Sequence, residues 1–527
     1  MISSYVHNSR ITVLQNYNKV HRNQLLILVL SLLGVLIHLF FYNNLGFHRD
    51  ELLYFSLGEH PDFGYFSVPP LIGILSFVLT KIFGYSLFAA KILPAIAGGG
   101  MVYLVALIVS EMNGSLFAQI LAGIGMICSI LFLRSFGLFQ PVFLDIFFWT
   151  LSLYFILRYI NSNQRKQLFF FGITVGLGLL NKYNLLFLLI SLLLTLPFTR
   201  HRKLFLKNEF YIAILIVFLI LLPNIIWQIY HHLPVLSHLG ELRGSQLARM
   251  SASTFLSEQL LMIYPATIIA FPGLVFLLFS KKLQSYRCVG ISLTVVLILY
   301  LALQGKSYYS AGIYPLLISS GAVFYEKYLK NIVWRVVFVA TMLFLTGLLL
   351  PMGVPSKSPE KLVAYFDKMA KITKSDAVRR YENNKYYQLP QDYADMLGWD
   401  ELAAITNKAW LQVEYKGQCI IYAENYGQAG AITILGRKYH LPEAISFSDN
   451  FRYWIPKSFD KEITEFIYIN DEPGADIKAL FGEIREVGRI TNPLARECGT
   501  KVYLCKQPKS SFNQFWGNRM QRLQEYR

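Results

Sequence analysis

Long apolar runs fill the first two thirds of the chain and are separated by short polar stretches. A helix that crosses the hydrocarbon core of a bilayer needs about 20 apolar residues, with a working range of about 17 to 25. About eleven runs meet this length or nearly so. They are 24–42, 86–109, 115–133, 142–160, 167–180, 183–199, 209–229, 259–279, 288–303, 309–325 and 333–350. The pattern predicts an all-α polytopic membrane bundle of about eleven transmembrane helices.

A further apolar run, 69–83, is shorter, opens with Pro69-Pro70 and carries Lys81. We expect a juxtamembrane or re-entrant helix there. If it does not cross, the basic residues of the loops fall mostly on one side, which is typical of the cytoplasmic face. That side holds Arg10, Lys19, Arg22, Arg158, Arg165, Lys166, Arg200, Arg202, Lys203, Lys207, Lys281, Lys282, Arg287, Lys327, Lys330 and Arg335, and the other only Arg49, Arg134, Lys182, Arg243, Arg249 and Lys306. The asymmetry predicts a cytoplasmic N-terminus.

The chain from about residue 352 onward has a different pattern. Strand-like runs at 419–423 and 466–469 alternate with helical stretches at 399–411 and 429–435. This alternation predicts a small α/β domain, which the eleventh span delivers to the outer face. We therefore expect a transmembrane domain at 1–351, whose first outer loop at 43–85 holds juxtamembrane helices, and an extracytoplasmic domain at 352–527.

Composition supports a membrane protein, since 54% of the 527 residues are hydrophobic and only 15% are charged. A net charge of +17 would suggest nucleic acid as the partner of a soluble chain. Here most of the basic residues lie in short loops, where they act as topology signals, so we expect no nucleic acid. The five cysteines show no metal-type spacing, and whether Cys498 and Cys505 pair stays open. The first apolar run lacks a small-residue cleavage site and is predicted to be a retained anchor.

Ionisable residues also occur where the membrane should be apolar. The segment His48-Arg49-Asp50-Glu51 follows directly on the first apolar run, and Asp145 lies just inside the fourth. Interfacial anchoring would explain the first segment, but an intramembrane carboxylate costs about 2.5 to 3.5 kcal/mol and is a functional candidate by default.

Lys182 and Lys306 occupy two predicted outer turns, where the alternative is snorkelling towards lipid head groups. In the predicted topology these lysines, Asp50, Glu51 and Asp145 all fall at one face of the membrane. A polar chamber of this kind suits a substrate with a phosphate, which a lysine neutralises, and a hydroxyl, which a carboxylate deprotonates.

Several motifs follow one another in a specific order along nearly the whole chain. They are FHRDEL at 47–52, GYFSVPPL at 64–71, LD at 144–145, GLLNKY at 178–183, LPNIIWQ at 222–228, GKSYY at 305–309 followed by YP at 314–315, GWDEL at 398–402 and NYGQAGA at 425–431. In these motifs the chain resembles glycosyltransferase family 39 of the GT-C class, whose relatives include protein O-mannosyltransferases and lipid A aminoarabinose transferases. The resemblance implies a GT-C fold.

The resemblance also implies an inverting transfer of a hexosyl or pentosyl group from a polyprenyl-phosphate donor to a lipid, glycan or protein acceptor at the outer face of a bacterial inner membrane. Asp50 would be the general base, with Glu51 and Asp145 as further catalytic candidates. Asp145 would orient the acceptor, help a metal or hold the basic residues in place. The substrate-binding candidates are Arg49, Lys182, Lys306, Tyr308, Tyr309, Arg134 and His48.

One departure concerns a metal. Some relatives carry a charged residue directly before the Pro-Pro-Leu motif, whereas this chain has Val68. A divalent metal ion stays possible, but no ligands are assigned.

The main alternative to an enzyme is a transporter or flippase of polyprenyl-linked lipids or glycans. Transporters tend to show paired, inverted halves with broken helices near the midplane, and none is visible in the sequence. A membrane scaffold is a second alternative, but a scaffold would not need a carboxylate inside a span.

Overall fold

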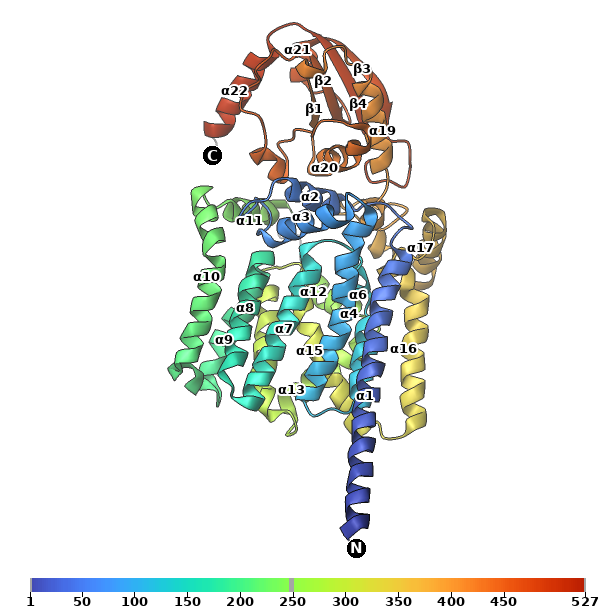
Figure 1. Ribbon diagram of the computed structural model, residues 1–527. Coiled ribbons are helices and arrows are strands. Elements are labelled where there is room, and N and C mark those ends of the chain that lie inside the picture. Colours follow the sequence, from blue (N-terminus) through green and yellow to red (C-terminus); the bar gives the residue numbers. More distant parts are fainter. Residues whose placement is uncertain (1, 246–250, 526–527) are drawn as a thin grey trace. The chain divides into compact units, whose positions relative to one another are not determined.

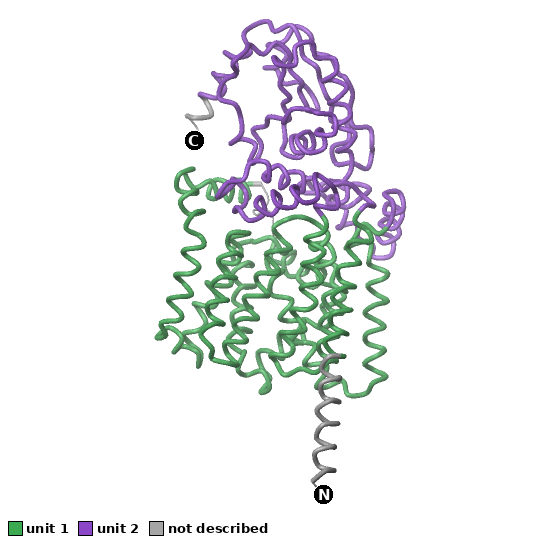
Figure 2. The backbone as a smooth tube through the Cα atoms, viewed as in Figure 1, with its two compact units in different colours: residues 1–42, 91–356 green, residues 43–90, 357–527 purple. Residues whose placement is uncertain are grey.

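The computed structural model describes residues 2–245 and 251–525, which divide into two compact units (Figure 2). Unit 1 comprises residues 1–42 and 91–356, and unit 2 comprises residues 43–90 and 357–527. This division differs from the sequence-based one for the first outer loop, which the sequence grouped with the membrane helices. The physical reason is visible within unit 2, where α2 of that loop packs closely against α20 of the C-terminal region.

Unit 1 consists of helices, and its long helices run side by side (Figure 1). Its elements are α1 (Ile2–Phe41), α4 (Leu87–Glu111), α5 (Leu116–Ile127), α6 (Ile130–Ser135), α7 (Pro141–Ser162), α8 (Arg165–Asn181), η1 (Tyr183–Leu185), α9 (Leu186–Thr195), η2 (Leu196–Phe198), η3 (Arg202–Leu206), α10 (Asn208–Tyr230), α11 (Pro234–Ser245), α12 (Ala252–Leu261), α13 (Thr267–Phe279), η5 (Gln284–Tyr286), α14 (Arg287–Ala302), η6 (Ser307–Ile313), α15 (Tyr314–Tyr328) and α16 (Ile332–Gly353).

Each predicted span coincides with a helix or with a run of shorter helices. The segment predicted at 115–133 is broken into α5 and α6, and the segment at 259–279 holds the end of α12 and all of α13. Among the described residues, 6 helices are long and apolar enough to cross a membrane. They are Arg22–Phe41, Leu87–Glu111, Pro141–Ser162, Asn208–Tyr230, Gln284–Ala302 and Ile332–Gly353. The polytopic helical architecture is confirmed, and the count of eleven spans stays a prediction.

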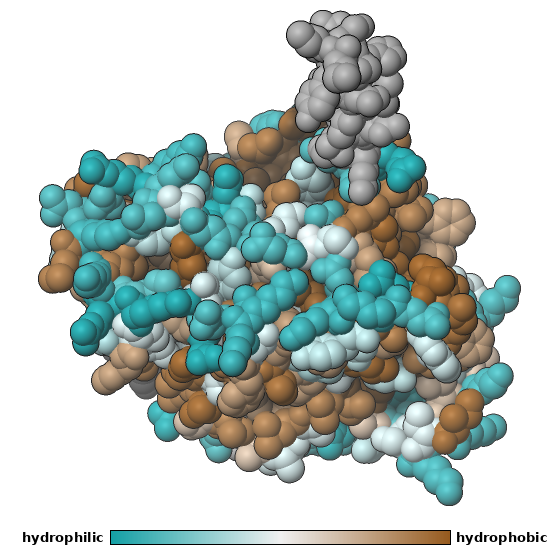
Figure 3. Space-filling model, turned by 90° about the horizontal axis from the view of Figure 1, so that it is seen from below, coloured by the Kyte–Doolittle hydropathy of each residue, from teal (hydrophilic) through white to brown (hydrophobic). Residues whose placement is uncertain are grey.

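The connections that carry the predicted cytoplasmic charges gather at one end of unit 1. Arg158 of α7 pairs with Glu111 of α4 at 3.4 Å, and Tyr286 of η5 donates a hydrogen bond to the Glu111 carbonyl at 2.7 Å. Lys281 and Lys282, in the loop before η5, are exposed. Figure 3 shows hydrophilic side chains gathered on the face seen from this end. The loops that were separated in sequence therefore share one polar surface.

Unit 2 contains a four-stranded sheet with the order β1-β2-β4-β3. Strand β1 is parallel to β2, and β4 is antiparallel to both β2 and β3. The small α/β domain predicted from the sequence is thereby confirmed. The elements of unit 2 are α2 (Arg49–Glu59), α3 (Leu71–Phe83), α17 (Pro359–Thr373), η7 (Ala377–Arg379), α18 (Gln391–Ala394), α19 (Trp399–Trp410), η8 (Lys416–Gln418), β1 (Cys419–Ala423), α20 (Tyr426–Leu435), η9 (Gly436–Tyr439), η10 (Asp449–Tyr453), β2 (Glu465–Asn470), α21 (Ala475–Leu480), β3 (Phe481–Arg489), β4 (Lys501–Pro508) and α22 (Phe512–Glu525).

The core of this domain is aromatic and lies on one face of the sheet. Phe466 of β2 stacks on Phe481 of β3, with ring centroids 5.8 Å apart, and Phe512 of α22 packs against both. Such ring contacts add to the burial of large apolar surface, so they fix the sheet against α22. Cys505 of β4 is buried in this core, whereas Cys498 is exposed, and both thiols are free.

Candidate active site

Asp145 of unit 1 lies near the start of α7, and its side chain is buried. The side-chain amide of Asn184 in η1 donates to Oδ2 of Asp145 at 2.7 Å and to the backbone carbonyl of Tyr309 at 2.9 Å. The Tyr300 hydroxyl of α14 donates in turn to the Asn184 carbonyl oxygen. Buried polar groups are costly unless they are hydrogen-bonded. This network therefore holds the Asp145 carboxylate in a fixed position among four segments.

Lys182 and Lys306 approach the Tyr308 ring from two different turns, and Lys182 also approaches Tyr309. The Lys182 ammonium lies 4.8 Å from the ring centroid of Tyr309 and 5.1 Å from that of Tyr308. The Lys306 ammonium lies 5.9 Å from the Tyr308 centroid. We call these four residues the lysine–tyrosine cluster. Lys182 is attracted by Asp145 and repelled by Lys306. Two ammonium groups beside one buried carboxylate favour an anionic ligand.

The absence of a side chain at Gly312 of η6 allows η6 to lie close to α7. A Cβ atom on Gly312 would lie 2.4 to 2.6 Å from side-chain carbons of Trp149, which is fully buried on α7. Contacts this short do not occur between real carbon atoms, so a larger residue would push η6 away. Gly312 thus keeps the turn that follows Lys306 against the helix that carries Asp145. Arg134, the remaining candidate in unit 1, lies half-buried on α6.

The other candidates belong to unit 2, where α2 begins with a capping box. His48 is the N-cap residue, and its Nδ1 accepts a hydrogen bond from the Asp50 backbone N–H at 3.1 Å. The Glu51 carboxylate accepts from the His48 backbone N–H at 2.9 Å. Reciprocal bonds of this kind satisfy the free amide groups of the first turn. Both His48 and Glu51 are buried, so they fix the start of the helix from which Arg49 and Asp50 project.

Asp50 and Arg49 meet α20 at Tyr426. The Tyr426 hydroxyl donates to Oδ1 of Asp50 at 2.9 Å, and the Arg49 guanidinium lies 4.3 Å from the Tyr426 ring centroid. Burial, and after it the Asp50 charge, raises the pKa of Tyr426 well above its ordinary value of 10, which keeps the phenol protonated as a donor. A Cβ atom on Gly427 would lie 2.6 Å from Cγ of Arg49. The glycine therefore allows α20 to approach α2 this closely.

A second carboxylate, Asp449, interacts electrostatically with both Asp50 and Tyr426. The Ser67 hydroxyl donates to Oδ1 of Asp449 at 2.9 Å. This bond joins the segment before the Pro-Pro-Leu motif to η10. Burial raises the pKa of Asp449 to about 6. Unit 2 therefore holds two neighbouring carboxyl groups in different environments, which is a common device for separating a proton acceptor from a proton donor.

Asp449→Asn should remove one pH dependence of the free energy of unfolding. The raised pKa of Asp449 means that the folded protein binds this proton more tightly than the unfolded chain does. The contribution is fully present below about pH 4 and is lost as the pH rises through about 6, so it amounts to on the order of 1 to 2 kcal/mol between these limits. In thermal unfolding from pH 4 to 7, the wild type should lose stability relative to Asp449→Asn. The exposed Asp460, changed to Asn, is the matched control and should follow the wild type. If the stability of the wild type and that of Asp449→Asn differed by the same amount at every pH, the raised pKa of Asp449 would be contradicted.

Among the described residues, no group of three or more His, Cys, Asp or Glu side chains forms a constellation that could hold a metal ion. The metal ligands that the sequence left unassigned stay unassigned.

Residues 67–227 match the family model described as dolichyl-phosphate-mannose-protein mannosyltransferase. Two solved structures of ArnT from Cupriavidus metallidurans are similar to the chain. The form bound to undecaprenyl phosphate gives a TM-score of 0.61 at 13% identity, and the apo form gives 0.58 at 12%. Each alignment covers 91% of this chain and 97% of ArnT. The resemblance to family 39 of the GT-C class is confirmed.

The structural likeness to ArnT covers 91% of this chain, and at 12–13% identity it shows the fold alone. The family match includes Asp145 and Lys182 but stops before Lys306. Among curated protein sequences, none matches the chain.

Sequence reasoning missed several residues of the candidate site. Asn184 is a polar residue in an apolar run, so the criterion that selected Asp145 would also have found it. The same applies to Gln259 of α12, whose side-chain oxygen accepts hydrogen bonds from Ser310 and Tyr314 at 2.6 Å each. Tyr426 lies 376 residues from Asp50 in sequence, so no local pattern could have paired them.

Proposed function

We propose that the chain transfers a sugar from a polyprenyl-phosphate donor to an acceptor hydroxyl and inverts the anomeric carbon. The observation that carries the proposal is the lysine–tyrosine cluster, where two ammonium groups from separate turns share the Tyr308 ring, and Lys182 also lies over the Tyr309 ring. This excess of positive charge suits a lipid-linked phosphate. The family match over residues 67–227 supports the same class of donor.

In the proposed reaction, the Asp50 carboxylate takes the proton from the acceptor hydroxyl. The hydroxyl oxygen forms a bond to the anomeric carbon as the bond from that carbon to the phosphate oxygen breaks, and the electron pair leaves on the phosphate. Lys182 and Lys306 neutralise the leaving phosphate, while Tyr308 holds both lysines in place and Tyr309 holds Lys182. One base and one charge-neutralising group suffice, unlike the paired carboxylates of glycoside hydrolysis.

The remaining candidates take supporting roles in the proposal. Arg49, held over the Tyr426 ring, supplies positive charge next to Asp50. His48 and Glu51 position Asp50 by capping α2. Asp145 holds the Lys182 ammonium through electrostatic attraction. Arg134 is a further phosphate partner.

The donor lipid is proposed by analogy of fold, since ArnT was solved with undecaprenyl phosphate bound. The sugar is a hexose or a pentose, and the acceptor is a lipid, a glycan or a protein. A decisive test uses membranes from cells that make the chain and from cells that lack it, each incubated with labelled polyprenyl-phosphate sugars. Label should move from the lipid into a second pool only when the chain is present. No transfer with any donor would instead favour the flippase alternative.

We also propose that the chain lies in a bacterial inner membrane, with its N-terminus in the cytoplasm and residues 352–527 outside. The exposed Cys498 offers a test, since the other four cysteines are buried. A membrane-impermeant maleimide should label the chain in intact spheroplasts, and Cys498→Ser should abolish the labelling. Labelling that appears only after lysis would place this domain on the cytoplasmic side.

A further inference from the structure

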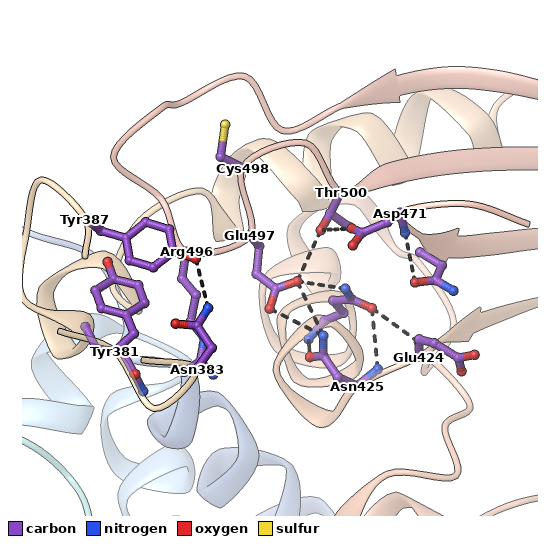
Figure 4. A pocket seen from close by; sticks show the side chains of 13 residues that line it. Tyr381, Asn383, Tyr387, Glu424, Asn425, Asp471, Arg496, Glu497, Cys498 and Thr500 are labelled. Atoms are coloured by element: carbon purple, nitrogen blue, oxygen red, sulfur yellow. Dashed lines mark hydrogen bonds between the residues drawn. The ribbon is translucent and has the colours of Figure 1, made fainter. Parts of the chain in front are cut away.

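A pocket of about 370 Å³ opens in unit 2 at the carboxyl ends of the two parallel strands (Figure 4). Glu424 and Asn425 follow directly on β1, and Asn470 and Asp471 lie at the end of β2. In open α/β sheets, ligands bind in the crevice outside the carboxyl ends of parallel strands. We call this cavity the strand-end pocket.

One wall of the strand-end pocket is a connected set of amide, hydroxyl and carboxylate groups. The Glu497 carboxylate accepts from the side-chain amide of Gln428 at 2.8 Å and from that of Asn425 at 3.3 Å. The Thr500 hydroxyl lies 3.2 Å from both Glu497 and Asp471. These side chains are already fixed by hydrogen bonds to one another, so they lose little conformational entropy when a ligand binds. A wall of this composition suits a ligand with several hydroxyl groups.

The opposite wall is aromatic. Tyr381 and Tyr387 stack with their ring centroids 4.0 Å apart and their planes 23° apart. Tyr381 is 7% exposed and Tyr387 is 41% exposed, so the second ring presents apolar surface at the pocket. Asn383 donates to the Tyr387 hydroxyl at 2.9 Å, which fixes the ring. Figure 4 shows the two rings on the side away from Glu497 and Asp471. A flat ring facing polar groups matches a sugar ring, whose C–H face is apolar and whose edge carries hydroxyls.

The charge of the residues that line the pocket further limits the chemical class of its ligand. Glu424, Asp471 and Glu497 line it with three carboxylates, and Arg496 supplies positive charge. Arg496 is paired with Asp395 outside the pocket at 3.0 Å. The lining is therefore net negative, which attracts amino groups, tolerates neutral hydroxyls and repels phosphate, sulfate and uronate groups.

We propose that the strand-end pocket binds a neutral or amino saccharide. This inference does not depend on sugar transfer, because the pocket is built from residues of unit 2 that take no part in the proposed reaction.

The test applies fluorescently labelled full-length protein in detergent micelles, with no donor present, to an array of neutral, amino, uronic-acid and sulfated oligosaccharides. Tyr387→Ala should weaken binding to the best glycan at least tenfold, and Tyr387→Phe should keep it, since the ring remains. Tyr386→Ala is the matched control, because Tyr386 is an exposed neighbour outside the pocket. Glu424→Gln should reduce the preference for amino over neutral sugars.

Three results would overturn the proposal. The first is no glycan bound above the level of Tyr387→Ala. The second is binding of uronic-acid or sulfated glycans as strong as that of neutral ones. The third is an equal effect of Tyr386→Ala and Tyr387→Ala.

Discussion

Asp50→Asn should reduce the rate of sugar transfer by about 10² to 10⁴, the range that a positioned general base contributes. Asparagine keeps the shape of the side chain and an oxygen that accepts from the Tyr426 hydroxyl, but it cannot take the proton of the acceptor. The loss should therefore appear in kcat, while the fold persists. The measurement is the initial rate of label transfer by purified protein, with the thermal unfolding midpoint recorded in parallel.

Asp62→Asn is the matched control for this variant, since Asp62 lies in the same loop and is exposed. It should transfer sugar at the wild-type rate. If Asp50→Asn kept its activity, another residue would be the base. If it lost its unfolding transition instead, the Asp50–Tyr426 hydrogen bond would be structural, and the assignment of Asp50 as base would fall.

Lys182→Met should lower kcat by about 10² to 10³, as expected for the loss of one group that stabilises developing charge. The phosphodiester of the donor carries one negative charge, whereas the phosphate that leaves carries up to two. Lysine therefore stabilises the transition state more than the bound donor, and the effect on kcat should exceed the effect on KM. Lys306→Met should show the same pattern, since both ammonium groups contact the Tyr308 ring.

Lys182→Arg tests whether charge or shape matters, because arginine keeps the charge and should recover part of the rate. Lys281→Met removes a lysine at an exposed position of the same unit and should leave transfer unchanged. A kcat for Lys182→Met equal to that of the wild type would contradict the role of the lysine–tyrosine cluster. So would a change confined to KM.

The helical architecture could be predicted because the thickness of the bilayer sets the length of the apolar runs. Every run that the apolar pattern marked is a helix or a chain of short helices, since backbone groups in a bilayer must be bonded within the segment. Run length could not reveal the breaks between α5 and α6 and between α12 and α13. Only Cys128 and Ser129 separate Ile127 from Ile130 at the first break, which is too short an interruption to divide the apolar run.

Single residues of the candidate site could be selected from sequence for a similar reason. Asp145, Lys182 and Lys306 stood out because charge is costly among apolar residues. The energetic cost of burying these charged side chains does not indicate which residues they contact in the folded protein. Packing brings the Asn184 amide to Asp145, and it brings the Tyr308 ring, which already neighbours Lys306, to Lys182 as well.

The amino-acid sequence by itself determined the membrane-helix class, the α/β nature of the C-terminal region and the identity of most charged candidates, because the hydrophobic effect and the cost of charge act on each residue locally. Only the tertiary structure decided that the first outer loop shares a compact unit with the C-terminal region, that Tyr426 donates to Asp50, and that a polar pocket forms at the strand ends. These features depend on contacts between segments hundreds of residues apart, and side-chain packing alone specifies such contacts.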